Sequence, residues 1–132
     1  MKVTGDLRRR MIVALGDPEA QQIVSSVIRE SRTSSTIAKE LGLPASTVYR
    51  KIGQMRECGL LLVERFLIGP DGKREALYTC AFTEIRFKAE AKNLELEITL
   101  SQKALEKRWF EMFFSKTQEA PDWQPSTASG TS

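Results

Sequence analysis

Small, hydroxylated, aromatic and cationic side chains are interleaved with apolar ones between Ala45 and Gln54. If this segment is a helix, Val48, Ile52 and Met55 share one face and the polar side chains share the other. Polar side chains of these types can bond to phosphates and to base edges, and near a helix N-terminus they can enter a major groove. We therefore interpret the segment as a recognition helix whose DNA-contacting candidates are Ser46, Thr47, Tyr49, Arg50 and Gln54.

The sequence around this helix predicts a helix, a turn and a second helix. The first helix is expected to begin at a Ser34 or Ser35 cap and to end at Gly42, because a residue without Cβ suits the left-handed position after a helix. Leu43 is expected to pack into the core. Pro44 then begins the second helix, since its fixed φ and missing N–H cost nothing in a first turn.

A β-hairpin is predicted directly after the second helix. Residues 60–68 and 74–82 are rich in β-branched, aromatic and aliphatic residues. The five residues between them, 69–73, read Gly-Pro-Asp-Gly-Lys, which is a dense turn signal.

The run SSTIAKELGLPASTVYRKIGQMRECGLL resembles the helix-turn-helix core of winged-helix transcriptional regulators of the ArsR/MarR-like kind in archaea and bacteria. The likeness extends from about Asp17 to Cys80. It implies an α+β fold that binds double-stranded DNA, with the hairpin as a wing along the minor groove or the backbone. The wing charges placed for that contact are Arg65, Lys73 and Arg74.

Three alternatives to DNA binding remain open for these elements. Winged helices also serve as protein-interaction or assembly modules that touch no DNA, since a fold does not fix a function, and RNA binding is a third possibility. The polar helix face and the basic hairpin are also compatible with surfaces that are merely solvated.

Composition limits the remaining classes. A chain of 132 residues is expected to form one domain, and its 41% hydrophobic and 28% charged residues are typical of a soluble protein. We expect a cytoplasmic protein, because no apolar run is long enough for a membrane span and no signal peptide is recognisable. Residues 1–80 carry 13 Lys and Arg against 9 Asp and Glu, whereas residues 81–132 carry 7 against 8, so the excess positive charge lies with the recognition helix.

Histidine is absent and only two cysteines occur. We therefore expect no enzyme, no metal site and no cofactor, since those sites need clusters of imidazole or thiolate ligands or a phosphate loop. Metal-sensing members of the resembled family bind their effector through paired cysteines in a helix, and this sequence has no such pair. Cys58 and Cys80 are expected to be buried, inert thiols; the alternative is a redox switch.

Upstream of the helix-turn-helix, residues 1–16 are expected to form a basic arm or a short helix that ends before Gly16. Its three arginines, residues 8–10, either contact phosphates or form a solvated face. Asp17 and Pro18 predict the start of a core helix that extends to Ser31, followed by a short extended link at residues 32–33 that adds a third strand to the wing sheet.

Downstream of the wing, the alternation in residues 84–91 and 94–100 predicts a second hairpin. A final helix is expected from the Ser101 cap to about Ser115. Its broad apolar stripe predicts homodimerisation, with the interface residues Leu105, Trp109, Phe110, Met112 and Phe113, continued by Phe114. The alternative is that this stripe folds back onto the second hairpin.

The sequence thus predicts a homodimeric, sequence-specific regulator in four parts. Residues 1–16 form the N-terminal arm or helix, 17–82 the winged helix-turn-helix, 83–116 the extra hairpin and dimerisation helix, and 117–132 a disordered tail. A small-molecule effector is neither predicted nor excluded.

Overall fold

The computed structural model describes residues 1–92 and 94–108. In chain order, the described elements are β1 (Lys2–Val3), α1 (Gly5–Leu15), α2 (Pro18–Ser26), α3 (Ser34–Leu41), α4 (Ala45–Glu57), β2 (Leu61–Ile68), β3 (Arg74–Cys80), β4 (Phe82–Ala89), β5 (Leu94–Leu100) and α5 (Gln102–Glu106).

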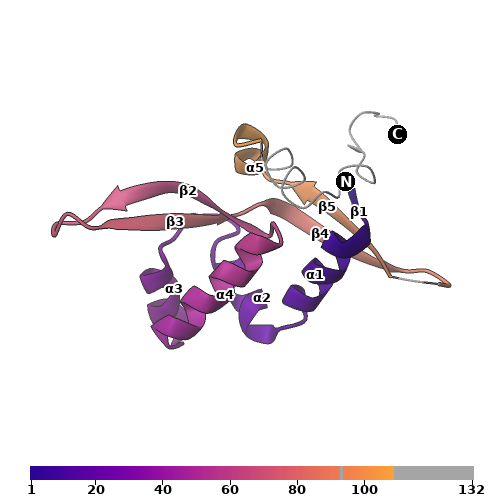
Figure 1. Cartoon of the computed structure of the whole chain (residues 1–132), viewed down its shortest axis with the longest axis horizontal. Helices are drawn as coiled ribbons and strands as arrows, with labels where there is room; N and C mark the ends of the chain where they lie inside the picture. Colours follow the sequence, from indigo (N-terminus) through magenta and orange to yellow (C-terminus); the bar gives the residue numbers. More distant parts are fainter. Residues whose placement is uncertain (93, 109–132) are drawn as a thin grey trace.

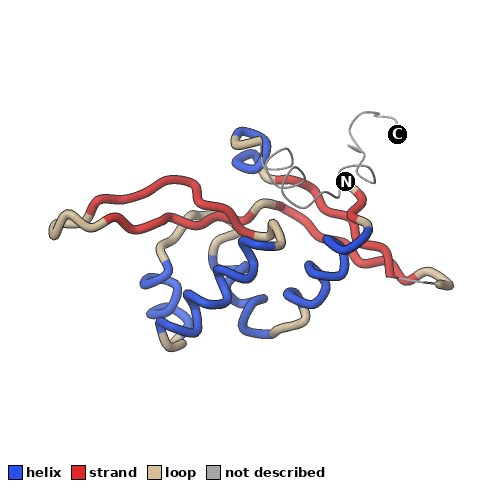
Figure 2. The backbone as a smooth tube through the Cα atoms, viewed as in Figure 1, coloured by secondary structure: helices blue, strands red, loops and turns tan. Residues whose placement is uncertain are grey.

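The helices α1 to α4 lie on one side of two long β-hairpins (Figure 1). The β2–β3 hairpin extends beyond α3 at one end of the molecule, and the β4–β5 hairpin extends in the opposite direction. Figure 2 shows that β3 and β4 follow one another along the long axis of the molecule. This arrangement is a helix-turn-helix with a wing, so the predicted α+β winged helix-turn-helix is confirmed.

Strand pairing is antiparallel in both sheets. β2 and β3 form the wing alone, and β1, β5 and β4 form a three-stranded sheet in that order. Ala81 joins β3 to β4: its N–H donates to the Leu60 carbonyl and its carbonyl accepts from the Ser101 N–H. The predicted link strand is an isolated antiparallel bridge between Arg32 and Tyr78.

The turn between α3 and α4 follows the sequence closely. Gly42 adopts a φ of 68°, where an L side chain would be strained. The Leu43 N–H donates to the Ala38 carbonyl at 3.1 Å and Leu43 packs partly buried against the core, as predicted. Pro44 was predicted in the first turn of the helix but occupies the N-cap of α4 with a ψ of 140°, and the helix begins at Ala45.

One core joins the helices to both hairpins. Its largest fully buried side chains come from every helix in the α1–α4 group and from β1, β2 and β5, and they include Leu7, Met11, Ile23, Ile37, Ile52, Met55, Leu61 and Leu96. α4 contributes Val48, Ile52 and Met55, as its predicted apolar face requires. Burial of these side chains fixes which face of α4 turns outward.

The N-terminal residues are a helix and not a mobile arm. α1 spans Gly5–Leu15 and buries Leu7 and Met11. The preceding β1, which the sequence did not indicate, pairs with β5, and the amino group of Met1 donates to the Ile98 carbonyl at 2.7 Å.

Two predicted helix boundaries at the N-terminal side are wrong. α2 begins at Pro18 behind its Asp17 cap, as predicted, but ends at Ser26 instead of Ser31. At this end the Nε of Arg32 donates to the carbonyl of Ser26 at 2.7 Å and so satisfies an acceptor that the helix leaves without a partner. α3 is capped by Thr33 and not by either serine: the Thr33 Oγ1 accepts from the Thr36 N–H at 3.2 Å.

The predicted helix from Ser101 to Ser115 is also wrong in its length. Ser101 caps α5 as predicted, and its Oγ also donates to the Cys80 carbonyl at 2.9 Å. α5 nevertheless ends at Glu106, and Arg108 has a φ of 53°, which a continuing right-handed helix does not allow. Residues 109–132 lie outside the described residues.

Within the described residues, no helix is long and apolar enough to cross a membrane. No group of three or more His, Cys, Asp or Glu among them could hold a metal ion.

Candidate nucleic-acid interface

The polar face of α4 is turned to solvent. Ser46, Arg50 and Gln54 are exposed, Thr47 is half-buried, and 66% of the Tyr49 surface is accessible. The exposed Tyr49 ring is accessible to a partner, to which it offers an apolar body and a polar hydroxyl.

None of these five side chains is held by another part of the described chain. They form no side-chain hydrogen bond and no ion pair among residues 1–92 and 94–108. The donors and acceptors of the polar face are therefore available to a ligand without first breaking an internal contact.

Ion pairs to α2 hold α4 in this orientation. Lys51 pairs with Asp17, the N-cap of α2, and with Glu19 at 3.6 Å. Only 12% of the Lys51 side chain is exposed. The hydrogen bond from Lys51 lowers the pKa of Asp17 from its usual value. The residue that follows Arg50 thus anchors α4, while Arg50 itself faces outward.

The wing places its basic residues on an exposed ribbon. Arg65, Lys73 and Arg74 are all exposed. A bulge in the pairing between Val63 and Arg65 interrupts the alternation of β2. The tip forms as predicted from Gly69 to Lys73, with Gly72 at a φ of 81° and the Lys73 N–H donating to Asp71 at 3.0 Å.

Arg74 makes a contact that the sequence did not indicate. Its guanidinium lies 4.2 Å from the centre of the Phe66 ring. This cation–π contact holds the charge at a fixed place on the wing surface.

An exposed apolar strip on the wing was also missed. Phe66 and Ile68 are 50% and 68% exposed and share a face of the hairpin with Arg74 and Ala76, as the strand register requires. Ala76 packs against the core, so this face is the one that looks toward the helices. The sequence indicates this strip only through residues 65–68, Arg-Phe-Leu-Ile, because three apolar residues in a row depart from the alternation of apolar and polar residues in a half-buried strand.

Glu64 connects the base of the wing to its neighbours. It accepts a hydrogen bond from the Ser31 hydroxyl and pairs with Lys103 of α5 at 3.4 Å. The Ser31 bond is the main reason that the pKa of Glu64 lies below its usual value of 4.5. Ser35 of α3 donates to Glu75 of β3 at 3.0 Å, which attaches the wing to the helices a second time.

The two thiols are buried, as expected. Burial raises the pKa of Cys58 from 9.0 to about 11 and that of Cys80 from 9.0 to about 12. A redox switch needs a thiolate at neutral pH, and these surroundings disfavour it.

Of the predicted dimer interface, Leu105 lies within the described residues. Leu105 is 53% exposed at the end of α5. Trp109, Phe110, Met112, Phe113 and Phe114 lie outside the described residues.

Comparisons with known proteins agree with this geometry. A family model described as "Helix-turn-helix domain" matches residues 15–64, which include α2, α3 and α4. An uncharacterised HTH-type transcriptional regulator from Pyrococcus abyssi is 42% identical over 53 residues, which are 40% of this chain and 34% of that protein. The chain thus spans about a third of the length of this curated relative.

The solved structures that the comparison returned have low sequence identity to this chain and low TM-scores. Reduced HlyU from Vibrio cholerae is 14% identical with a TM-score of 0.40, over 83% of this chain and 87% of that one. NolR from Sinorhizobium fredii is 13% identical, also with a TM-score of 0.40, over 85% and 93%. The assignment therefore rests on the family model and on the elements described above: the chain contains a winged helix-turn-helix of the kind found in transcriptional regulators. The narrower ArsR/MarR resemblance stays a prediction.

Proposed function

We propose that this chain is a non-enzymatic transcriptional regulator that binds double-stranded DNA with α4 in the major groove and the wing along the flanking backbone. The exposed face of α4, polar and without internal partners among the described residues, is the observation that carries the proposal. The helix-turn-helix match at residues 15–64 supports it, since this motif places its second helix in the major groove.

Sequence specificity is assigned to Ser46, Thr47, Tyr49, Arg50 and Gln54. Arginine and glutamine can each form two hydrogen bonds with one base edge, and the serine and threonine hydroxyls bond to bases or phosphates. Arg65, Lys73 and Arg74 contact phosphates and supply affinity that does not depend on sequence.

The regulator acts as a homodimer in this proposal. The apolar residues of 105–114 support it, because a sequence with so many large side chains needs a surface to cover them. A twofold dimer would place two α4 helices about one DNA turn, ~34 Å, apart and would select a palindromic site. We place this regulator in the cytoplasm, and its four parts are residues 1–16, 17–82, 83–116 and 117–132.

DNA binding is tested by selecting duplexes from a random pool with the full chain and then measuring fluorescence anisotropy. We expect an enriched sequence that binds more tightly than a scrambled duplex, with affinity that falls as salt rises. Duplex RNA of the selected sequence serves as the control for RNA binding. Failure to bind any duplex at low salt would refute the proposal.

The dimer is tested by sedimentation equilibrium of the intact chain and of a variant with Trp109→Glu and Phe113→Glu. We expect a dimeric wild type and a monomeric, folded variant. A wild type that is monomeric at micromolar concentration, or a variant that remains a dimer, would show that residues 105–114 are not the interface.

A protein-interaction module is the second candidate, and the exposed Phe66, Leu67 and Ile68 favour it. Apolar side chains grouped on an exposed strand are typical of a protein contact. Under this alternative the chain binds no duplex, and substitution of Phe66 and Ile68 by serine removes a partner without any effect on nucleic acid.

A further inference from the structure

Two large apolar side chains are exposed on one face of the wing. Phe66 and Ile68 are 50% and 68% exposed, and strand alternation turns them to the same side of the hairpin. We call these two residues the apolar pair. Leu67, between them, is turned to the opposite side and lies across from Glu75 in the strand register. Neighbouring apolar side chains on a projecting hairpin form a surface that a partner would cover.

Cations border the apolar pair. Arg74 lies opposite Ile68 in the register, and its guanidinium is 4.2 Å from the centre of the Phe66 ring. Lys73 precedes it at the tip and is exposed. Neither cation forms an ion pair with a carboxylate among residues 1–92 and 94–108. A partner that suits this surface is therefore anionic at its rim and apolar within. A nucleic-acid groove has this chemistry, because phosphates border it and base faces stack inside it.

The face that carries the apolar pair continues toward α4. On β3 it runs from the wing through Ala76 to Tyr78. Burial raises the pKa of the Tyr78 hydroxyl, and Arg56 and Tyr49 of α4 also act on that pKa, which places Tyr78 within electrostatic reach of α4. Tyr49 belongs to the exposed face that we assign to the major groove. A duplex held on α4 would therefore meet the side of the wing that carries the apolar pair.

Only single side chains of the wing can enter a minor groove. A major groove admits a two-stranded ribbon, but the minor groove is only about 6 Å wide. Ile68 is the last residue of β2, so it lies nearer the tip of the wing, which extends beyond α3 (Figure 1). Arg74 covers one side of the Phe66 ring, so this ring cannot stack between two base pairs with both of its faces. Ile68 is the member of the pair that is left to enter.

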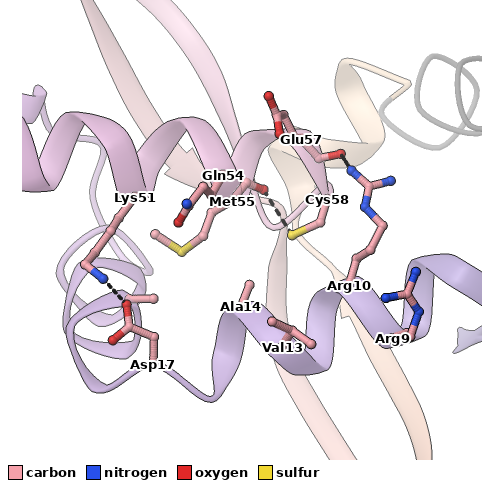
Figure 3. A pocket seen from close by; sticks show the side chains of 11 residues that line it. Arg9, Arg10, Val13, Ala14, Asp17, Lys51, Gln54, Met55, Glu57 and Cys58 are labelled. Atoms are coloured by element: carbon pink, nitrogen blue, oxygen red, sulfur yellow. Dashed lines mark hydrogen bonds and ion pairs between the residues drawn. The ribbon is translucent and has the colours of Figure 1, made fainter.

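A side chain that separates base pairs needs a rigid support, because the duplex resists deformation. The base of the wing bonds to the α2–α3 link, to α3 and to α5. Lys51 pairs with Asp17 and so holds α4 against α2. Arg10 of α1 donates to the Glu57 carbonyl at the end of α4 at 2.9 Å. Figure 3 shows these two contacts of α4 beside a pocket of about 400 Å³ between α1 and α4. The wing and α4 are thus both fixed to the same helices.

We propose that Ile68 enters the minor groove beside the α4 site and wedges between two base pairs, so that the duplex kinks there; the proposal rests on the proposed DNA-binding function. Arg74 and Lys73 then bond to the phosphates that border the groove, and the Phe66 ring lies against the sugars. Pyrimidine–purine steps unstack most easily. The wing therefore selects such a step through its deformability, without a hydrogen bond to any base edge, and adds a sequence preference to the bases that α4 reads.

The test follows DNA bending by energy transfer between fluorophores at the two ends of the selected duplex, ~30 base pairs long, with the full chain bound. We expect the wild type to bring the ends closer, as a kink of roughly 20–90° requires. Ile68→Ala should still bind, as measured by anisotropy, but should leave the ends near their separation in the free duplex. Leu67→Ala is the matched control: it removes the same number of carbon atoms from the opposite face of the wing and should bend the duplex as the wild type does.

Two further measurements separate a wedge from a simple charge contact. Ile68→Lys adds a cation to the wing, so its affinity for the duplex should be retained or raised while the bend is lost. Replacing the flexible step beside the α4 site by a stiff A-tract should weaken binding of the wild type several-fold and leave the affinity of Ile68→Ala nearly unchanged.

The outcomes distinguish failure of the wedge from failure of the proposed function. The wedge is overturned if the wild type binds the duplex without bending it, if Ile68→Ala bends it as strongly as the wild type, or if the A-tract weakens both proteins equally. Each of these results leaves DNA binding standing and leaves the apolar pair for a protein contact. A chain that binds no duplex at all would overturn the DNA-binding function and the wedge together.

Discussion

Arg50→Ala tests the recognition role of α4 most directly. The Arg50 side chain is exposed and has no hydrogen bond or ion pair within residues 1–92 and 94–108, so its removal should change the free energy of unfolding by less than about 0.5 kcal/mol. Removal of a bidentate contact to a guanine edge costs roughly 1–3 kcal/mol of binding. That energy corresponds to a roughly 5- to 150-fold weaker complex with the selected duplex.

The assay is fluorescence anisotropy of the selected and scrambled duplexes at one fixed salt concentration, together with urea unfolding of each variant. Arg50→Lys should give an intermediate loss, because the charge is retained but the planar pair of donors is not. Arg86→Ala is the charge-matched control: it lies on β4, in the hairpin that extends away from the wing, and 69% of its side chain is exposed (Figure 1). We expect its affinity for both duplexes to stay close to that of the wild type.

The outcome for the two duplexes decides what Arg50 does. A loss confined to the selected duplex supports base readout. Equal losses on both duplexes would reassign Arg50 to a phosphate. Unchanged binding on both, in a variant that is as stable as the wild type, would refute the proposed role of α4 in DNA recognition.

Three further outcomes follow from the wing and its base. Replacing Lys73 and Arg74 by alanine should lower the slope of log affinity against log salt by nearly ~0.9 for each phosphate that the protein no longer neutralises, and an unchanged slope would place the wing away from the backbone. Because folding lowers the pKa of Glu64, this carboxylate stabilises the folded chain fully above pH 4.5, and the stabilisation is lost as the pH falls through the folded-state pKa. Ser31→Ala should reduce this acid-dependent loss of stability, measured by urea unfolding at a series of pH values. An unaltered pH dependence would contradict the role given to Ser31. In a variant with Cys58 replaced, the folded chain should react with a thiol reagent at Cys80 about a thousandfold more slowly than a free thiol does, because a pKa raised from 9.0 to about 12 lowers the thiolate fraction by that factor. Unfolding in urea should restore the fast reaction. Fast reaction of the folded chain would show that the thiol is accessible.

Local conformations were readable from the sequence because they depend on residues close together in the chain. Gly42 ends α3 in the left-handed conformation, Asp17 and Pro18 begin α2, and the turn of residues 69–73 closes the wing. Each of these positions has a residue type whose backbone preference decides the outcome by itself. The apolar face of α4 was equally readable, because its helical period selects the side that must be buried.

Helix ends were decided by contacts that the local sequence does not specify. The pattern of apolar residues continues past Ser26, yet α2 ends there, and Arg32, six residues later, donates to its terminal carbonyl. The end of α5 at Glu106 contradicts an apolar stripe that continues to Phe114. Periodicity indicates where a helix would be amphipathic, but it does not indicate where the backbone leaves the helix.

Pairings between distant segments were decided by the tertiary structure alone. The two residues of β1 are too few to give a strand pattern. They pair with β5, and the adjoining α1 packs into the same core. The pocket beside Arg10 likewise arises from α1 and α4, which α2 and α3 separate along the chain. The sequence therefore determined which side chains α4 presents to solvent, through short-range backbone preference and helical period. The fold decided which charges are neutralised, because that depends on the groups that packing brings together.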